Sequence, residues 1–86
     1  MYVVINSPKI DNIFRKLAKK DPDRLEAIAK KLEEIVNNPH RFKSLSSNMK
    51  GFRRVHFGSF VLTYSIDEEN KAIILEDYDH HDNIYK

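Results

Sequence analysis

Histidine is the residue type of this chain best suited to acid–base chemistry, because an imidazole titrates near pH 6.5 and can both take up and release a proton. Two such groups can cleave RNA without a metal ion. One removes the proton of the 2′-hydroxyl that attacks the adjacent phosphate, and the other protonates the leaving 5′ oxygen. His56 and His81 are the candidates, far apart in the sequence but able to meet if the tail returns beside the strand that holds His56. The alternative is that both are ordinary surface histidines.

A basic segment precedes His56 directly. Residues 41–56 contain no acidic residue and five basic ones, namely Arg41, Lys43, Lys50, Arg53 and Arg54. The formal net charge of the whole chain is only +2, so the clustering of charge is more informative than its total. The clustering indicates an anionic ligand, such as a nucleic acid, that is bound at one place. An ordinary solvated surface is the alternative.

Other kinds of chemistry are excluded or disfavoured by the composition. The chain has no cysteine, which excludes disulfides and cysteine-ligated zinc. It has two glycines, too few for a phosphate-binding loop, and it lacks the P-loop, dinucleotide-binding and serine-nucleophile motifs. The run from Asp79 to Asp82 includes two histidines, but adjacent residues of an extended chain point in opposite directions. We therefore expect neither a metal site nor a cofactor.

The size of the chain favours one small domain. Its 86 residues allow one compact unit, residues 1–86. No apolar run approaches the roughly 20 residues that a membrane span needs, and the first residues lack the features of a signal peptide. The proportions of hydrophobic (41%) and charged (33%) residues are those of a globular protein. We expect a cytoplasmic domain that is not attached to a membrane.

Two stretches have the spacing of amphipathic helices. Ser7-Pro8 and Asp21-Pro22 are both typical helix starts, with a capping side chain followed by a proline in the first turn. Apolar residues then recur at intervals of three and four, and Asn37-Asn38-Pro39 ends the second helix. Because only a short turn separates the helices, we expect an antiparallel helical hairpin. We assign the charged residues of the outer faces, including Lys31, to solvent.

Four short apolar stretches, residues 2–5, 52–57, 60–66 and 71–77, predict β-strands. Gly58-Ser59 between the second and third stretch predicts a two-residue type II′ hairpin. Residues 78–86 form a polar and aromatic tail. The order β-α-α-β-β-β predicts an α+β fold, with the helical hairpin packed on one face of a small, mainly antiparallel sheet.

The predicted hairpin also fixes which side chains share a face of the sheet. Phe57 pairs with Phe60, His56 faces Val61, and side chains alternate between the two faces. The apolar face, which the helices must cover, holds Val55, Phe57, Phe60, Leu62, Tyr64 and Ile66. The other face holds Phe52, Arg54, His56, Val61, Thr63 and Ser65. We expect that second face to be open to solvent and able to hold a polyanion.

The C-terminal half resembles a known family. Lys43-Ser44-Leu45, the basic hairpin of residues 52–66 and the tail His80-His81-Asp82-Asn83-Ile84-Tyr85-Lys86, in this element order, resemble the RelE/ParE superfamily of toxin–antitoxin toxins, most of all RelE-type proteins of archaea. The resemblance covers essentially the whole chain. It implies a ribosome-dependent mRNA endonuclease that cleaves by 2′-hydroxyl attack in the A site. It also implies a RelB-like antitoxin as partner, in addition to the ribosome and mRNA.

The resemblance also implies roles for single residues. Arg54 and His56 stand where the family has basic residues of the second strand, one of them implicated as the general base. His81 stands where RelE toxins have the arginine that acts as general acid, although His80 is an alternative donor. Tyr85 matches the tail tyrosine that stacks on an mRNA base. To RNA binding we assign Lys43, Lys50, Arg53 and Lys86.

Val61 departs from the family pattern. RelE toxins usually have an arginine there that contacts the scissile phosphate, so the resemblance implies weaker cleavage by this chain. On the expected open face, Val61→Arg should increase cleavage without disturbing the core. Two alternatives remain open: a ParE-like toxin directed at DNA gyrase, and a catalytically weak homologue that mainly pairs with an antitoxin.

Overall fold

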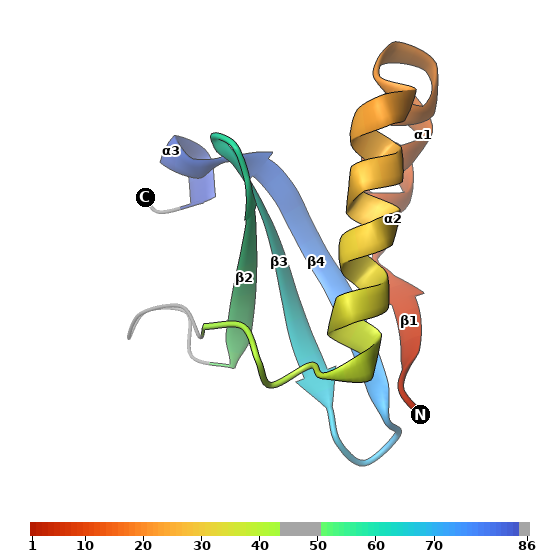
Figure 1. The fold of residues 1–86 in the computed structure, drawn as a ribbon, viewed down its shortest axis with the longest axis vertical. Coiled ribbons are helices and arrows are strands. Elements are labelled where there is room, and N and C mark those ends of the chain that lie inside the picture. Colours follow the sequence, from red (N-terminus) through yellow and green to blue (C-terminus); the bar gives the residue numbers. More distant parts are fainter. Residues whose placement is uncertain (44–50, 85–86) are drawn as a thin grey trace.

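The computed structural model of the chain describes residues 1–43 and 51–84. Two long helices lie beside a curved sheet, and a short third helix follows the last strand (Figure 1). The elements are, in order, β1 (Val3–Asn6), α1 (Pro8–Lys20), α2 (Pro22–Asn37), β2 (Phe52–Phe57), β3 (Phe60–Asp67), β4 (Ala72–His80) and α3 (His81–Ile84). None of the helices described is both long and apolar enough to cross a membrane.

Both long helices begin at the predicted residues. The Ser7 hydroxyl accepts a hydrogen bond from the Ile10 amide at 3.2 Å, and the Asp21 carboxylate accepts one from the Arg24 amide at 3.1 Å. Each cap satisfies an amide of the first turn that has no partner within the helix. The second helix ends at Asn37, as the sequence predicted.

The four strands form one sheet with the order β1-β4-β3-β2. The pairs β2–β3 and β3–β4 are antiparallel, whereas β1 runs parallel to β4. The α+β class and the mainly antiparallel sheet are therefore confirmed. The sequence had left the strand order open, and the structure places β4 in the interior of the sheet, between the first strand and the hairpin.

The β2–β3 hairpin has the predicted register. Phe57 pairs with Phe60, and His56 pairs with Val61. Gly58 has a φ of 63°. Ser59 does not have a positive φ, since Lys71 is the sole non-glycine with one among the described residues. A positive φ at the first loop residue but not at Ser59 is the pattern of a type II′ turn, so this prediction is confirmed.

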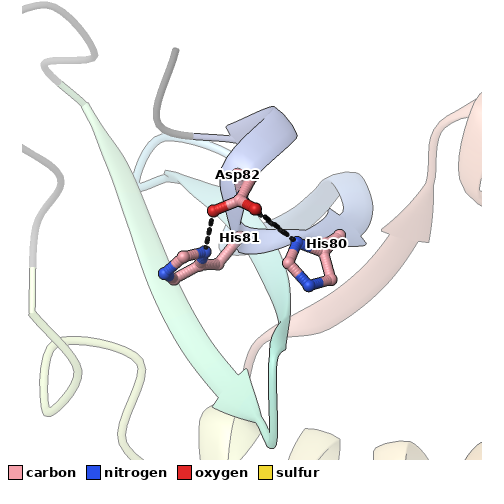
Figure 2. A group of neighbouring side chains, drawn as sticks. All are labelled: His80, His81 and Asp82. Carbon is pink, nitrogen blue, oxygen red and sulfur yellow. Dashed lines mark hydrogen bonds and ion pairs between the residues drawn. The ribbon is translucent and has the colours of Figure 1, made fainter.

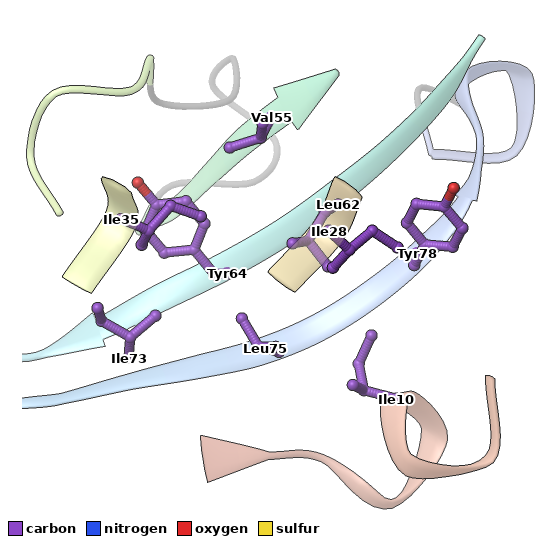
Figure 3. Packing of buried hydrophobic residues seen from close by; sticks show 9 residues of the cluster. All are labelled: Ile10, Ile28, Ile35, Val55, Leu62, Tyr64, Ile73, Leu75 and Tyr78. Atoms are coloured by element: carbon purple, nitrogen blue, oxygen red, sulfur yellow. The ribbon is translucent and has the colours of Figure 1, made fainter. Parts of the chain in front are cut away.

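The hydrophobic core lies between the two long helices and the sheet (Figure 3). Ile10, Ile28 and Ile35 extend from the helices and are completely buried. They pack against the sheet residues of the same cluster, which are Val55, Leu62, Tyr64, Ile73, Leu75 and Tyr78. Phe57, Phe60 and Ile66 lie at its margin, so the predicted apolar face is confirmed.

The opposite face is not as open as predicted. Val61 is fully buried and Thr63 is only 1% exposed, although both point away from the helix-side core. The tail also lies closer to the sheet than predicted: β4 continues to His80, and α3 then contacts both β4 and β3. Ile84 in α3 is itself buried. The expectation that an arginine at position 61 would leave packing undisturbed is therefore wrong.

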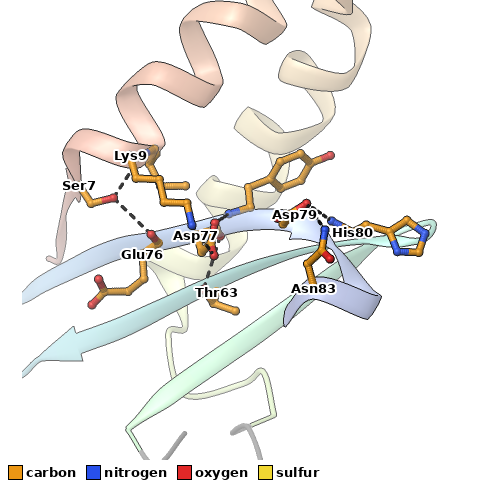
Figure 4. A network of polar contacts seen from close by, with 10 residues as sticks. Ser7, Lys9, Thr63, Glu76, Asp77, Asp79, His80 and Asn83 are labelled. Atoms are coloured by element: carbon orange, nitrogen blue, oxygen red, sulfur yellow. Dashed lines mark hydrogen bonds and ion pairs between the residues drawn. The ribbon is translucent and has the colours of Figure 1, made fainter. Parts of the chain in front are cut away.

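Polar side-chain contacts connect the start of α1 to β4 (Figure 4). The Ser7 hydroxyl donates to the Glu76 carbonyl oxygen at 3.3 Å, and the Lys9 ammonium lies 3.0 Å from the Asp77 carboxylate.

The β3–β4 register shifts between Thr63 and Tyr64. A bulge of this kind bends a strand and increases its twist, and it lies just before the segment of β4 that leads to α3.

Tyr64 is expected to make stability fall at alkaline pH. Its side chain is fully buried, its hydroxyl donates to the Pro39 carbonyl oxygen at 2.7 Å, and burial raises the pKa of Tyr64 to about 12. An unfolded tyrosine titrates near pH 10. Between these values the unfolded chain releases a proton that the folded chain keeps, so the free energy of unfolding falls as pH rises.

Urea unfolding of the parent and of Tyr64→Phe, each near pH 8 and near pH 11, measures this effect. The parent should lose more stability between the two pH values than Tyr64→Phe does, because phenylalanine cannot titrate. The comparison also separates titration from the loss of the Tyr64–Pro39 hydrogen bond in Tyr64→Phe, because that loss lowers stability at both pH values. Equal losses would show that Tyr64 does not govern the alkaline transition.

Candidate nucleic-acid interface

A basic groove runs along the outer edge of β2. It has a volume of about 470 Å³ and connects three parts of the chain: α2, the segment that follows it, and β2. Its lining residues are Lys31, Arg41, Phe42, Lys43, Arg54, Val55 and His56. Four permanent cations and one imidazole thus face a single hollow, which favours an extended anion.

Backbone and side-chain bonds hold the walls of this groove together. The Arg54 amide donates to the Lys43 carbonyl oxygen at 3.1 Å, which brings the loop against the edge strand. The Arg53 guanidinium donates to the carbonyl oxygens of His40 and Phe42 at 3.3 Å and 2.6 Å. The Phe42 ring lies below two cations, with Lys31 Nζ 5.9 Å and Arg41 Cζ 5.7 Å from its centroid.

Arg53 and Arg54 therefore belong to different faces of the sheet. Arg53 pairs with Tyr64, a core residue, whereas Arg54 pairs with Thr63 on the other face, which also carries His56. The contacts of the Arg53 guanidinium are those of a residue that fixes the loop. RNA binding by Arg53 stays a prediction. Because Arg53 lies on the face of the sheet opposite to Val61, it cannot replace the arginine that the family has at position 61.

One carboxylate partly offsets the charge of the groove. Glu34 lies 3.0 Å from Lys31 and 3.5 Å from Arg41. Exposed ion pairs of this kind contribute little energy and are readily exchanged for contacts with an anionic ligand. Lys43 and Arg54 line the β2 side of the same groove.

The two candidate proton carriers lie at the hairpin end of the sheet. His56 is exposed and is the second residue before Gly58. The His81 amide donates to the Ser59 carbonyl oxygen at 2.8 Å, so α3 is attached to the hairpin loop itself. The tail thus returns to the hairpin loop and contacts β3 and β4, whereas a meeting of His81 with His56 stays a prediction. Tyr85, Lys50 and Lys86 are outside the described residues.

The turn from β4 into α3 overturns the expectation of an extended tail. Asp79 accepts hydrogen bonds from the Asn83 side chain at 3.1 Å and from the His80 amide at 2.7 Å. These two bonds, the Asn83 bond most of all, lower the pKa of Asp79 below its usual range. The ionised carboxylate thus fixes the turn, and His80, His81 and Asp82 do not alternate as they would in a strand.

Sequence reasoning missed two members of the groove, Lys31 and Phe42. Lys31 was assigned to a solvated helix face, although it follows the buried Ile28 by three residues and precedes the buried Ile35 by four. This spacing places it at the margin of the packed stripe, and that signal could have identified it. Phe42 gave no comparable signal, since it lies in a segment without periodicity.

The chain matches known proteins over nearly all of its length. Residues 8–85 match the model of the family described as the ParE toxin of the type II toxin–antitoxin system parDE. A relative from Methanocaldococcus jannaschii, named "Putative toxin RelE4", is 51% identical over 100% of this chain and 93% of its own length. An uncharacterised protein from Methanosarcina mazei is 50% identical over 99% of this chain and 100% of its own length.

The fold matches solved structures as well. The toxin in the RelBE2 complex from Mycobacterium tuberculosis has a TM-score of 0.77 and 25% identity, with 92% of this chain and 96% of that chain covered. The Escherichia coli RelBE complex gives a TM-score of 0.80 at 18% identity, with coverages of 93% and 96%. These comparisons and the fold define a toxin of type II toxin–antitoxin systems. The chain belongs to the RelE/ParE toxin superfamily.

Proposed function

We propose that the protein is a ribosome-dependent mRNA endonuclease that arrests translation by cleaving mRNA in the A site, without a metal ion in the chemical step. The observation that carries the proposal is the basic groove along β2, which holds His56 and Arg54, together with the attachment of α3 and His81 to the adjacent hairpin loop. RNA is the polyanion that these groups suit, because its 2′-hydroxyl is an internal nucleophile.

In this mechanism His56 removes the 2′ proton and His81 protonates the leaving 5′ oxygen. Arg54 stabilises the negative charge that develops on the phosphorane. Lys43 and Lys50 hold neighbouring phosphates, Lys86 and Arg53 add positive charge, and Tyr85 stacks on a base. Action on translating ribosomes requires a cytoplasmic protein.

The proposed partner is a RelB-like antitoxin. Two structural neighbours are toxin–antitoxin complexes, RelBE and YoeB–YefM. A partner with acidic side chains would complement the groove and would keep RNA out of it. Co-expression with the product of the adjacent reading frame tests the pairing, and two proteins that purify separately would count against it.

Inducible expression in a bacterial host, with mapping of mRNA ends, tests the activity. New 5′ ends within translated codons, seen only while ribosomes are active, are the expected result. Because the matching family model describes ParE toxins, a gyrase-directed toxin is the second candidate. Unchanged mRNA ends together with inhibited DNA supercoiling would support it. If mRNA ends and DNA supercoiling are both unchanged, the protein is a homologue that only pairs with an antitoxin.

Lys43→Ala is expected to weaken RNA binding through the loss of one phosphate contact. The logarithm of the affinity for a single-stranded RNA oligonucleotide should then fall less steeply with the logarithm of salt concentration, by about 0.7 in slope. Lys19→Ala is the matched control, since Lys19 is exposed on α1 away from the groove. Equal slopes for Lys43→Ala and the parent would remove Lys43 from the interface.

A further inference from the structure

Three side chains at the end of β4 direct ligand atoms toward one point (Figure 2). His80, His81 and Asp82 each offer one atom, and these atoms all lie within 4.8 Å of one another. Asp82 joins the two imidazoles: its carboxylate lies 2.8 Å from Nδ1 of His81 and 3.5 Å from Nδ1 of His80. Within residues 1–43 and 51–84, no other group of three such ligands occurs.

The backbone that carries these side chains is fixed on both sides. The His81 amide is bound to the Ser59 carbonyl oxygen, and Asp79 accepts from the His80 amide and from Asn83. The His80 ring meets the Phe60 ring edge to face, with centroids 5.8 Å apart. The His80 and His81 rings are also edge to face, at 5.5 Å. The turn and the ring packing thus hold both Nδ1 atoms beside the Asp82 carboxylate.

This ligand set selects a particular class of ion. Two imidazole nitrogens and one carboxylate oxygen suit Zn²⁺ and similar borderline transition metals, whereas Mg²⁺ requires mainly oxygen ligands. With bonds of about 2.0–2.2 Å, tetrahedral ligands lie roughly 3.3–3.5 Å apart. The widest separation must close by up to about 1.3–1.5 Å, which these side chains can do because Asp82 is 73% exposed and His81 is 50% exposed.

We propose that His80, His81 and Asp82 bind one Zn²⁺ ion per chain. The ion takes the place between the imidazoles and the carboxylate. It replaces their present mutual contacts and the hydrogen bond of 3.2 Å that the Asp82 amide donates to Nδ1 of His80. A water molecule or a phosphate oxygen fills the open fourth position. The site goes beyond the proposed function, which uses no metal. If the proposed function holds, bound Zn²⁺ also inhibits cleavage, because His81 as a metal ligand can no longer protonate the leaving oxygen.

Calorimetric titration of the full chain with ZnCl₂ tests the site. The expected stoichiometry is one ion per chain, and His80→Ala and Asp82→Ala should each weaken binding by at least about 10- to 100-fold, the loss found for even outer-shell changes at metal sites. His40→Ala is the matched control, since His40 also faces a carboxylate, Glu68, at 3.4 Å, but with no third ligand. MgCl₂ should give no binding heat that depends on these residues.

Two results would overturn the proposal. Equal Zn²⁺ affinity of the parent, His80→Ala and Asp82→Ala would place the ion elsewhere, and half an ion per chain would show that Zn²⁺ bridges two molecules. Shifts of the His80 and His81 imidazole resonances on Zn²⁺ addition, without shifts of His40, give a readout that does not depend on activity. If zinc binds but the metal-free chain cleaves no mRNA, the site stands and the proposed function fails.

Discussion

Replacement of His56 by alanine is expected to lower ribosome-dependent mRNA cleavage by about 10²–10⁴-fold, the usual contribution of one general acid or base. His56 is exposed at the edge strand of the sheet, so its loss should change the free energy of unfolding by no more than about 0.5 kcal/mol. Cleavage of a defined mRNA on purified ribosomes, measured beside urea unfolding, separates the two effects.

The same measurement on His81→Ala should show a loss of similar size, because the leaving oxygen then lacks its proton donor. His40→Ala is the control: it removes an exposed histidine that lies beside Glu68 rather than at the hairpin end, and it should cleave like the parent. Parent-like cleavage by both His56→Ala and His81→Ala would show that neither histidine carries a proton in the reaction.

Val61→Arg is expected to destabilise the fold by about 3–5 kcal/mol, the cost of an uncompensated buried charge. Val61 is fully buried and lies on β3, the strand that α3 contacts together with β4. A typical domain has only about 5–15 kcal/mol of stability in total, so a large fraction of the chains should be unfolded at moderate urea concentrations. The urea midpoint, compared with that of the parent, measures the loss.

Ser59→Arg is the matched control, since Ser59 lies exposed in the adjacent hairpin loop. It introduces the same side chain at the same end of the sheet and should change stability by about 0.5 kcal/mol or less. A Val61→Arg protein that keeps the parental midpoint and cleaves faster would instead mean that α3 moves away and that position 61 reaches the substrate.

The fold followed from signals that are local in the chain. Ser7 and Asp21 mark helix starts by the chemistry of their own side chains, and Gly58 sets the hairpin register through its positive φ. Once the register is fixed, the alternation of side chains determines which residues share a face with His56. The position of β1 could not be predicted in this way, because its pairing with β4 depends on contacts between distant segments.

The site was less predictable than the fold because tertiary packing determines it. The shared face of Arg54 and His56 could be derived from the hairpin alone. Lys31 lines the groove only because α2 lies along the sheet. The bond of Arg53 to the Phe42 carbonyl oxygen could not be predicted from any sequence pattern. The helical turn after His80 likewise gave no signal, and an extended chain was expected there.

The parallel pairing of β1 with β4 has a consequence for how the protein folds. The Ser7–Glu76 bond spans 69 residues, and β4 lies between β1 and β3 in the sheet. Such a pairing raises the contact order, which slows folding because distant segments must meet before they gain stabilising contacts. During synthesis, the helical hairpin therefore has no complete sheet to pack on until residues 72–80 have emerged. The groove between α2 and β2 takes shape late, after most of the chain has been translated.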